Sequence, residues 1–139
     1  MSDIARACAD LLARSFPEGG SWSEQDIDAV LESPGGHLFE VDGGFLIAKS
    51  VLDEAEVWTI AVAPEMRRQG RARMLLEKAA RELAELGVEK LFLEVAEDNA
   101  GARALYEMSG FTESGRRRNY YRSKSGARMD AILLQKKLP

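Results

Sequence analysis

The segment from Thr59 to Met74 combines residue types that suit a phosphate group. Its apolar start is typical of a strand, a basic stretch containing Gly70 follows, and the pattern of a helix begins at once. The first turn of a helix has unpaired N–H groups and the positive end of the helix dipole, and both favour an anion. Gly70 lets the backbone come close to a ligand. Positive charge around the same point comes from Arg67, Arg68, Arg71 and Arg73. We therefore favour a phosphate site over the alternative, a solvated basic start of a helix.

Glu94 is a carboxylate near the end of an apolar strand expected over 90–96. By period-two alternation, the leucine and valine side chains of this strand share one face, and Phe92 and Glu94 share the other. Ligand crevices of α/β sheets lie at the carboxyl ends of strands. Partial burial there raises the pKa of a carboxyl, which is the property that a general base needs. The alternative is a carboxylate that reaches water or pairs with an arginine.

Tyr106 lies seven residues after Asn99 on the helix expected over 99–109, so the two share a face about two turns apart. That face could look towards the strand that carries Glu94. A tyrosine in this position is otherwise a packing residue whose hydroxyl finds a partner. We interpret Gly110 and Phe111 as a helix stop followed by a buried aromatic residue.

Two aromatic features leave both a functional and a structural interpretation open. Arg116–Arg118 followed by Tyr120 and Tyr121 form a basic and aromatic cluster, either a solvated loop or a device that holds an acceptor. Trp22 follows a Gly-Gly loop and is either an exposed recognition residue or part of the core.

The composition excludes several kinds of chemistry. The 139 residues include one histidine and one cysteine, and the charge balance is 19 − 23 = −4. One His and one Cys cannot build a zinc site of clustered ligands, and a nucleophilic triad would have to include His37, which we treat as structural. Cys8 falls on an apolar helix face and is interpreted as packing. We expect a cytoplasmic protein that does not associate with a membrane. This expectation rests on the lone cysteine, the absence of a secretory signal and the lack of a long apolar run. The net acidity argues against nucleic acid as a partner.

The hydrophobic pattern predicts a mixed α/β single domain over residues 1–139, with at least one crossover helix. On the long helix beginning at Arg71, one apolar face is predicted to include positions from Ala72 to Leu86. Asp42, Gly43 and Gly44 predict a hairpin turn. The expected helices are 4–13, 23–32, 71–86 and 99–109, and the expected strands are 37–41, 45–52, 56–62, 90–96, a strand from 111 and 129–136.

Taken together, these segments resemble the GNAT family of acyl-CoA N-acyltransferases over essentially the whole chain. Residues 67–72 match the family's pyrophosphate-loop pattern Arg/Gln-x-x-Gly-x-Gly/Ala. Within the family, the ordered set is similar to the members that acetylate the N-terminal alanine of small-subunit ribosomal protein eighteen. The further matching segments are Asp53–Ala55, Ile60–Val62, Leu93–Val95, Asn99, Ala104–Tyr106, Gly110–Phe111 and Arg117–Tyr121.

The resemblance implies a GNAT fold, with a mixed, mostly antiparallel central sheet, helices on both faces, and a first strand that is missing or very short. It implies acetyl-CoA as the cosubstrate and no metal. Glu94 matches the family's general base and Tyr106 its general acid. The implied cofactor-binding residues are Ile60, Ala61 and Val62 for the pantetheine arm, Arg67, Arg68, Gln69, Gly70, Arg71, Ala72 and Arg73 for the pyrophosphate, and Asn99.

The implied activity is transfer of acetyl to the N-terminal amine of a ribosomal protein by direct attack in a ternary complex. The alternatives are a GNAT enzyme that acts on a lysine, a polyamine or another small molecule, or an acyl-CoA sensor without catalysis. We expect a monomer or weak homodimer. The sequence departs from the family at Ser21-Trp22-Ser23, where many relatives have Pro-Trp-Ser, and this leaves the acceptor more open than the cofactor.

Overall fold

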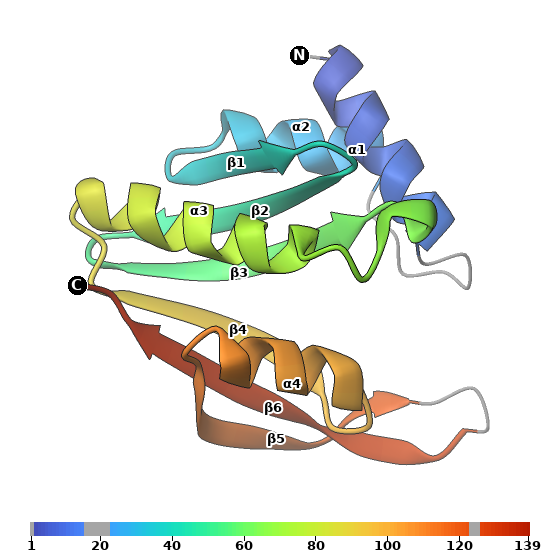
Figure 1. Cartoon of the computed structure of the whole chain (residues 1–139), viewed down its shortest axis with the longest axis vertical. Helices are drawn as coiled ribbons and strands as arrows, with labels where there is room; N and C mark the ends of the chain where they lie inside the picture. Colours follow the sequence, from blue (N-terminus) through green and yellow to red (C-terminus); the bar gives the residue numbers. More distant parts are fainter. Residues whose placement is uncertain (1, 16–22, 123–125) are drawn as a thin grey trace.

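The predicted order of helices and strands is confirmed, with one short 3-10 helix added after the third strand. The computed structural model describes residues 2–15, 23–122 and 126–139, and the side chains within 4–13, 23–120 and 126–139. The predicted break over 17–21 and Trp22 lie outside these residues. The elements are α1 (Ser2–Ser15), α2 (Glu24–Glu32), β1 (Gly36–Val41), β2 (Gly44–Val51), β3 (Glu54–Val62), η1 (Pro64–Met66), α3 (Arg71–Glu85), β4 (Lys90–Ala96), α4 (Ala100–Met108), β5 (Thr112–Arg122) and β6 (Arg128–Lys137) (Figure 1).

The strands form one mixed sheet in the order β1-β2-β3-β4-β6-β5. Only β3 and β4 pair in parallel, because α3 crosses over between them, and every other neighbouring pair is antiparallel. The parallel pairing covers just Glu54–Glu56 against residues 90–92. Beyond these residues β3 and β4 diverge, as their ribbons show in Figure 1, and we call the stretch where the two strands are no longer paired the opening. This opening is the feature of the fold on which the site depends.

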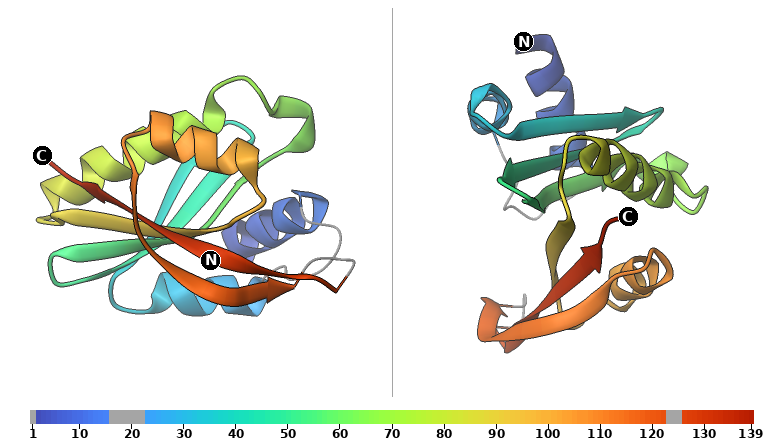
Figure 2. Two further views of the ribbon diagram at one scale, coloured as in Figure 1. Left: turned by 90° about the horizontal axis from the view of Figure 1, so that it is seen from below. Right: turned by 90° about the vertical axis from the view of Figure 1, so that its left-hand side faces the viewer.

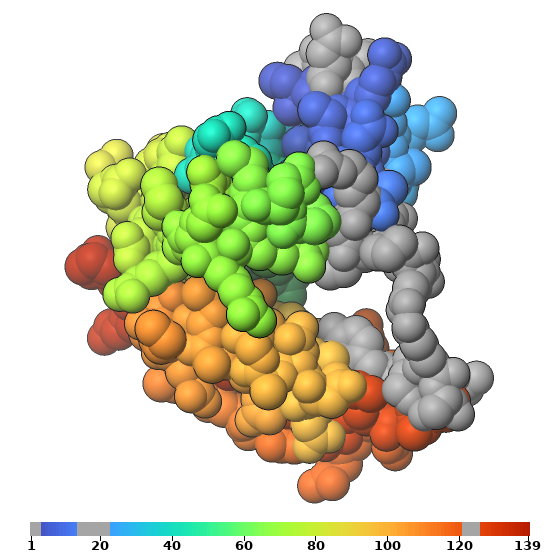
Figure 3. All heavy atoms as spheres, turned by 45° about the vertical axis from the view of Figure 1, so that its right-hand side comes forward, coloured from blue at the N-terminus to red at the C-terminus, as the bar shows by residue number. Residues whose placement is uncertain are grey.

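Helices cover both faces of the sheet, as expected (Figure 2). The larger core lies between the sheet and the pair α3 and α4, and includes Leu76, Leu93 and Ile132. The smaller core lies under α1 and α2 on the opposite face, and includes Phe45 and Ile47. We call the two sides the α3/α4 face and the α1/α2 face. The spheres of α3 lie beside those of α4 in Figure 3, so together these helices cover their face.

Local sequence signals explain where several elements begin and end. Ser23 and Asp26 form a reciprocal capping box that begins α2. Gly70, with φ of 77°, takes the left-handed conformation at the start of α3. The prediction that Leu86 joins the buried face of this helix is wrong. The helix ends at Glu85, and Leu86 in the turn is 67% exposed.

A β-bulge in β3 is the main irregularity on the α1/α2 face. Ile47 pairs with Thr59, but the next residue of β2 pairs with Val57, so Trp58 is an extra residue in β3. Because of the extra residue, the alternation of side chains between the two faces of the sheet shifts by one position at the bulge. Val57 before it and Ile60 after it both lie against the α3/α4 core. The alternation of polar and apolar residues alone could not predict this shift.

Among the residues that the structure describes, no group of three or more His, Cys, Asp or Glu side chains could hold a metal ion. No helix there is long and apolar enough to cross a membrane.

Candidate active site

The opening between β3 and β4 presents backbone groups of β3. Ala63 N donates to Gly43 O at 2.7 Å. This bond shows which residues of β3 form the hydrogen-bonded pairs with β2. Hydrogen-bonded and non-hydrogen-bonded pairs alternate along antiparallel strands, so Ala61 pairs towards β2. The backbone groups of Ile60 and Val62 therefore point to the β4 side, where β4 has already diverged. An extended chain could add to β3 here as a further strand would.

The basic loop before α3 lies just beyond this end of β3. Arg68 and Gly70 both have positive φ, 63° and 77°, the left-handed conformation that forms part of anion-binding nests of backbone N–H groups. None of the side chains that the structure describes caps the start of α3. A Cβ at Gly70 would meet no described atom within 4 Å, so the position is open to a ligand. These observations fit the predicted phosphate site.

Some side chains of the loop bond to other parts of the protein, and others are exposed beside Gly70. Arg71 is mostly buried and donates through Nε to Asp42 O at 2.7 Å and through Nη1 to Gln69 Oε1, so it anchors the loop on the β1–β2 turn. Arg73 pairs with Glu77 at 3.1 Å along the helix. Arg67 donates to Val62 O at 3.4 Å, which connects the loop to the opening. Arg68 and Gln69 are exposed beside Gly70.

Glu94 lies on the α1/α2 face, as the strand alternation predicted. Its side chain is 20% exposed, and Oε2 lies 3.3 Å from Nε of Arg117 on β5. The arginine pairing that the alternative interpretation expected therefore occurs, and it occurs inside a cavity of about 360 Å³. This acceptor-side cavity is lined by Glu56, Val57, Trp58, Glu94, Arg117 and Tyr120.

Tyr106 lies on the other side of the sheet. It is 8% exposed in the α3/α4 core, with its ring edge-on to Phe111 at 6.0 Å between centroids. Burial raises the pKa of its phenol above the ordinary value of 10.0, so the group stays protonated at neutral pH. Tyr106 and Glu94 therefore do not share a face, although both belong to elements at the opening. Asn99 caps α4, its side chain accepting from Ala102 N at 3.2 Å.

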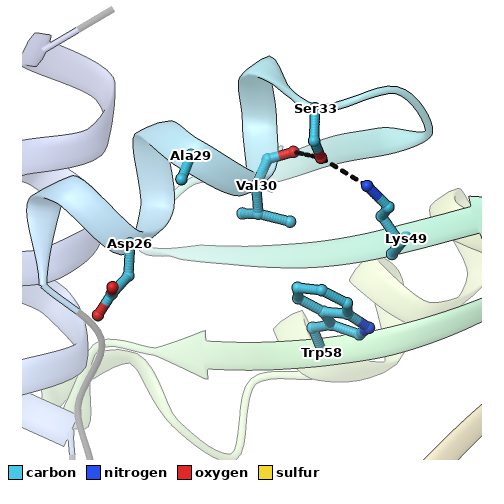
Figure 4. A pocket seen from close by; sticks show the side chains of 6 residues that line it. All are labelled: Asp26, Ala29, Val30, Ser33, Lys49 and Trp58. Atoms are coloured by element: carbon cyan, nitrogen blue, oxygen red, sulfur yellow. Dashed lines mark hydrogen bonds between the residues drawn. The ribbon is translucent and has the colours of Figure 1, made fainter.

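Trp58 separates the acceptor-side cavity from a second, mostly apolar one. Figure 4 shows its indole pointing towards Val30 of α2, with Lys49 above it donating to Ser33 Oγ at 2.6 Å. The second cavity measures about 450 Å³ and includes Asp26 and Ala29 in its lining. The bulge places Trp58, 43% exposed, between the two spaces.

His37 and Cys8 lie away from the opening, in agreement with their structural interpretation. His37 Nε2 is 2.8 Å from Ser50 Oγ, and the ring stacks on Phe39. Cys8 is 5% exposed in the core under α1 and α2. Phe111 is buried, as predicted for the residue after the helix stop.

Comparison with known proteins identifies the family. The sequence model of the Acetyltransferase (GNAT) family matches residues 5–111, well over half of the chain. The chain belongs to the GNAT family. The diverging strands and the glycine at the start of α3 are thus features of a GNAT fold.

Individual relatives of this GNAT chain carry more specific names. It is 51% identical over 90 residues to [ribosomal protein bS18]-alanine N-acetyltransferase of Escherichia coli K12, a match that covers 65% of this chain and 60% of that protein. It is 35% identical over 127 residues to N-alpha-acetyltransferase RimI of Mycobacterium tuberculosis, covering 85% and 78%. The crystal structure of the ribosomal-protein-S18-alanine N-acetyltransferase from Escherichia coli superposes with a TM-score of 0.88 at 37% identity, covering 99% and 90%.

A more distant GNAT structure agrees on the fold. The GNAT acetyltransferase of Elizabethkingia anophelis with acetyl-CoA bound has a TM-score of 0.73 at 24% identity, and the match covers 93% of this chain and 89% of that one.

The sequence interpretation missed Trp58 as a lining residue of the site. Its segment was correctly predicted as a strand, but the face that Trp58 takes depends on the bulge. The sequence did single out Arg117 and Tyr120 as a cluster that could hold an acceptor, and the structure brings both into the cavity of Glu94.

Proposed function

We propose that this chain transfers an acetyl group from acetyl-CoA to the N-terminal α-amine of a protein, and that the acceptor is the N-terminal alanine of ribosomal protein bS18. One observation carries the proposal: the open start of α3 and the cavity of Glu94 flank the same opening between β3 and β4. The names of the relatives from Escherichia coli and Mycobacterium tuberculosis support the choice of acceptor.

The cofactor side follows from the loop before α3. The first-turn N–H groups of α3 and the guanidinium groups of Arg67, Arg68 and Arg73 would hold the pyrophosphate. Gly70 admits it without a side chain in the way. The pantetheine arm would extend along β3, hydrogen-bonded to Ile60 and Val62. Gln69, Arg71 and Ala72 shape the loop, Ala61 holds β3 on β2, and Asn99 would contact the cofactor from the start of α4.

The acceptor side suits a primary amine. Glu94 would take a proton from the incoming ammonium, directly or through a water molecule, inside the cavity that it shares with Tyr120 and Trp58. An α-amine has a pKa of about 8 and a lysine amine one of about 10.4, so an α-amine loses its proton at neutral pH at much lower cost. This difference favours an N-terminus over a lysine.

The transfer needs no covalent enzyme intermediate. The neutral amine would attack the thioester carbonyl, so that a C–N bond forms as the C–S bond breaks. Val62 N–H would donate to the oxygen that becomes negative. Glu94 would keep the proton taken from the ammonium and return it to water after the product leaves. The second proton, which the nitrogen loses as the amide forms, would go to the departing thiolate, so that the products are the amide and CoA with a free thiol.

Tyr106 would act on the leaving thiolate from the α3/α4 face. A phenol of pKa about 10 is a weaker acid than a thiol of pKa about 8.5, so full proton transfer is uphill by about 2 kcal/mol in water. Burial raises the pKa of Tyr106 further. We therefore assign Tyr106 a hydrogen bond to the thiolate rather than a complete proton transfer.

The test is mass spectrometry of three peptides incubated with this protein and acetyl-CoA. One peptide has a free N-terminal alanine, one has a blocked N-terminus, and one offers only a lysine amine. Acetylation of the first alone is expected. Acetylation of the lysine peptide at a comparable rate would contradict the α-amine assignment, and binding of acetyl-CoA with no thiol release from any amine would mark a sensor.

A further inference from the structure

The strand β5 carries a bulge beside the acceptor-side cavity. Arg117 pairs with Ala131 and Tyr121 with Met129, so residues 118–120 lie opposite Asp130 alone. At the centre of this bulge Asn119 has a φ of 54°, the left-handed region that few non-glycine residues adopt. Such a conformation persists only where its surroundings hold it.

Side chains from β6 hold the bulge. Asn119 N donates to Asp130 Oδ1 at 3.0 Å, and Arg128 donates to Asn119 O at 3.2 Å. Both backbone groups of Asn119 thus bond to side chains instead of to a neighbouring strand. Asp130 is well placed for this role, because its side chain is only 18% exposed.

Asp130 is itself fixed by contacts with the end of β4. Glu97 N donates to Asp130 O at 2.9 Å, and Asp130 N lies 3.4 Å from Glu97 Oε1. Arg116 joins the two carboxylates, at 2.9 Å from Glu97 Oε2 and 3.5 Å from Asp130 Oδ2. Glu97 follows Glu94 by three residues, so this polar group connects the strand of Glu94 to the bulge.

The position of Arg117, on the face of the sheet opposite to Arg116, depends on these contacts. Arg116 and Arg117 are adjacent in β5 and point to opposite faces, as successive strand residues do. Arg116 therefore anchors β5 on one face, and Arg117 reaches Glu94 at 3.3 Å on the other. The guanidinium of Arg117 also lies 5.2 Å from the centre of the Tyr120 ring, within the bulge.

We propose that Asp130 is a positioning residue for acetyl transfer: its carboxylate holds the Asn119 bulge, and the bulge sets Arg117 and Tyr120 against Glu94 in the acceptor-side cavity. The role in transfer rests on the proposed function, whereas the geometric role does not. Loss of Asp130 disturbs the acceptor side alone, because the start of α3 and the backbone of β3 make no contact with it in the structure described.

The first measurement is independent of activity. The Nε–H NMR signal of Arg117 reports its ion pair with Glu94, and Glu94→Gln gives the signal expected once that pair is lost. Asp130→Ala should move the Arg117 signal in the direction of the Glu94→Gln spectrum and speed hydrogen exchange at Asn119 N–H. Glu113→Ala is the matched control, because Glu113 also pairs with Arg116, at 3.4 Å, but does not contact Asn119. An Arg117 signal unchanged in Asp130→Ala would overturn the proposal.

The second measurement separates KM from kcat with the alanine-terminated peptide. Asp130→Ala should raise the peptide KM by about tenfold, the equivalent of about 1.4 kcal/mol, while the Kd for acetyl-CoA changes by less than about twofold. Asp130→Asn keeps an oxygen that can accept from Asn119 N–H and should restore most of the loss. If Asp130→Ala does not fold, Arg128→Ala still decides, because it removes the donor to Asn119 O. It should raise the peptide KM and leave the acetyl-CoA Kd unchanged, and equal changes in the two quantities would contradict an acceptor-side role. A wild-type protein inactive on every peptide refutes the proposed function, and the NMR result still judges the bulge.

Discussion

Glu94 and Tyr106 lie on opposite faces of one sheet, and this separation gives them different partners. Glu94 faces the cavity shared with Arg117 and Tyr120, whereas Tyr106 belongs to the core under α3 and α4. A base that meets the amine and a donor that meets the thiolate need to approach the thioester from two sides. The stretch where β3 and β4 are no longer paired lies between those two sides.

Removing the Tyr106 hydroxyl should slow transfer without unfolding the protein. Tyr106→Phe keeps the buried ring and its edge-on contact with Phe111. We expect kcat to fall by about 10- to 100-fold, because a positioned donor is lost from the leaving group. The melting temperature and the acetyl-CoA Kd serve as controls. Since burial raises the pKa of Tyr106, the wild-type rate should not decline from ionisation of this phenol between pH 7 and 9, and a decline that Tyr106→Phe abolishes would contradict the assignment.

The thiol of Cys8 should be inert in the folded protein. Burial, with a smaller contribution from Glu40, raises the pKa of Cys8 to about 11. At pH 8 alkylation by iodoacetamide should therefore be at least about 100-fold slower in the native protein than in urea, because the thiolate is the reactive form. Equal rates in the two states would show that α1 does not bury Cys8.

At the scale of elements, the sequence predicted strands and helices better than the contacts between them. Alternation along β4 correctly placed Glu94 on the face opposite to Leu93 and Val95, because a straight strand keeps its period of two. The pairing of Glu94 with Arg117 depends on the register of β5 against β6, and a bulge of β5 interrupts that register. Trp58 was missed for the same reason, since a bulge inserts a residue that no hydrophobic period marks.

The start of α3 allows a matched test of the phosphate site. Gly70 and Gly87 flank α3, both have positive φ, and a Cβ at either would meet no described atom within 4 Å. Gly70→Ala and Gly87→Ala should therefore each lower the free energy of unfolding by about 1 kcal/mol, the cost of a left-handed conformation for alanine.

Only one of these two variants should weaken the binding of acetyl-CoA. Gly70→Ala should raise the acetyl-CoA Kd by about tenfold, or about 1.4 kcal/mol, and Gly87→Ala should leave it unchanged. Isothermal titration calorimetry and urea unfolding give the two quantities. Equal effects of both variants on the Kd would contradict a phosphate site at the start of α3.

At the scale of the whole molecule, the net charge of −4 conceals two different surfaces. The loop before α3 is rich in arginine, whereas Asp53, Glu54 and Glu56 place carboxylates at the start of β3, where Glu56 lines the acceptor-side cavity. This division suits a cofactor with phosphates on one side and an acceptor with a free ammonium on the other. The net charge alone hides both groups of residues, but their separation along the chain is already apparent in the sequence.

His37 should make the stability of the molecule depend on pH. Burial lowers the pKa of His37 below 6.5, so the unfolded chain binds a proton more readily than the folded one. The stabilisation from neutral His37 is therefore present above pH of about 6.5 and is lost as the pH falls through the lowered value. His37→Gln should flatten this part of the profile. Urea unfolding of both proteins from pH 8 to 5 tests it, and parallel profiles would count against the prediction.

In the proposed reaction, Glu94 activates an amine on one face of the sheet while acetyl-CoA binds from the other. The most direct measurement is thiol release with the alanine-terminated peptide, from pH 6 to 9, for wild type and Glu94→Gln, alongside acetyl-CoA binding to both. Loss of a general base should lower kcat by about 10²-fold or more, with the acetyl-CoA Kd within about twofold of wild type. A Glu94→Gln enzyme that keeps wild-type turnover throughout this pH range would contradict the account.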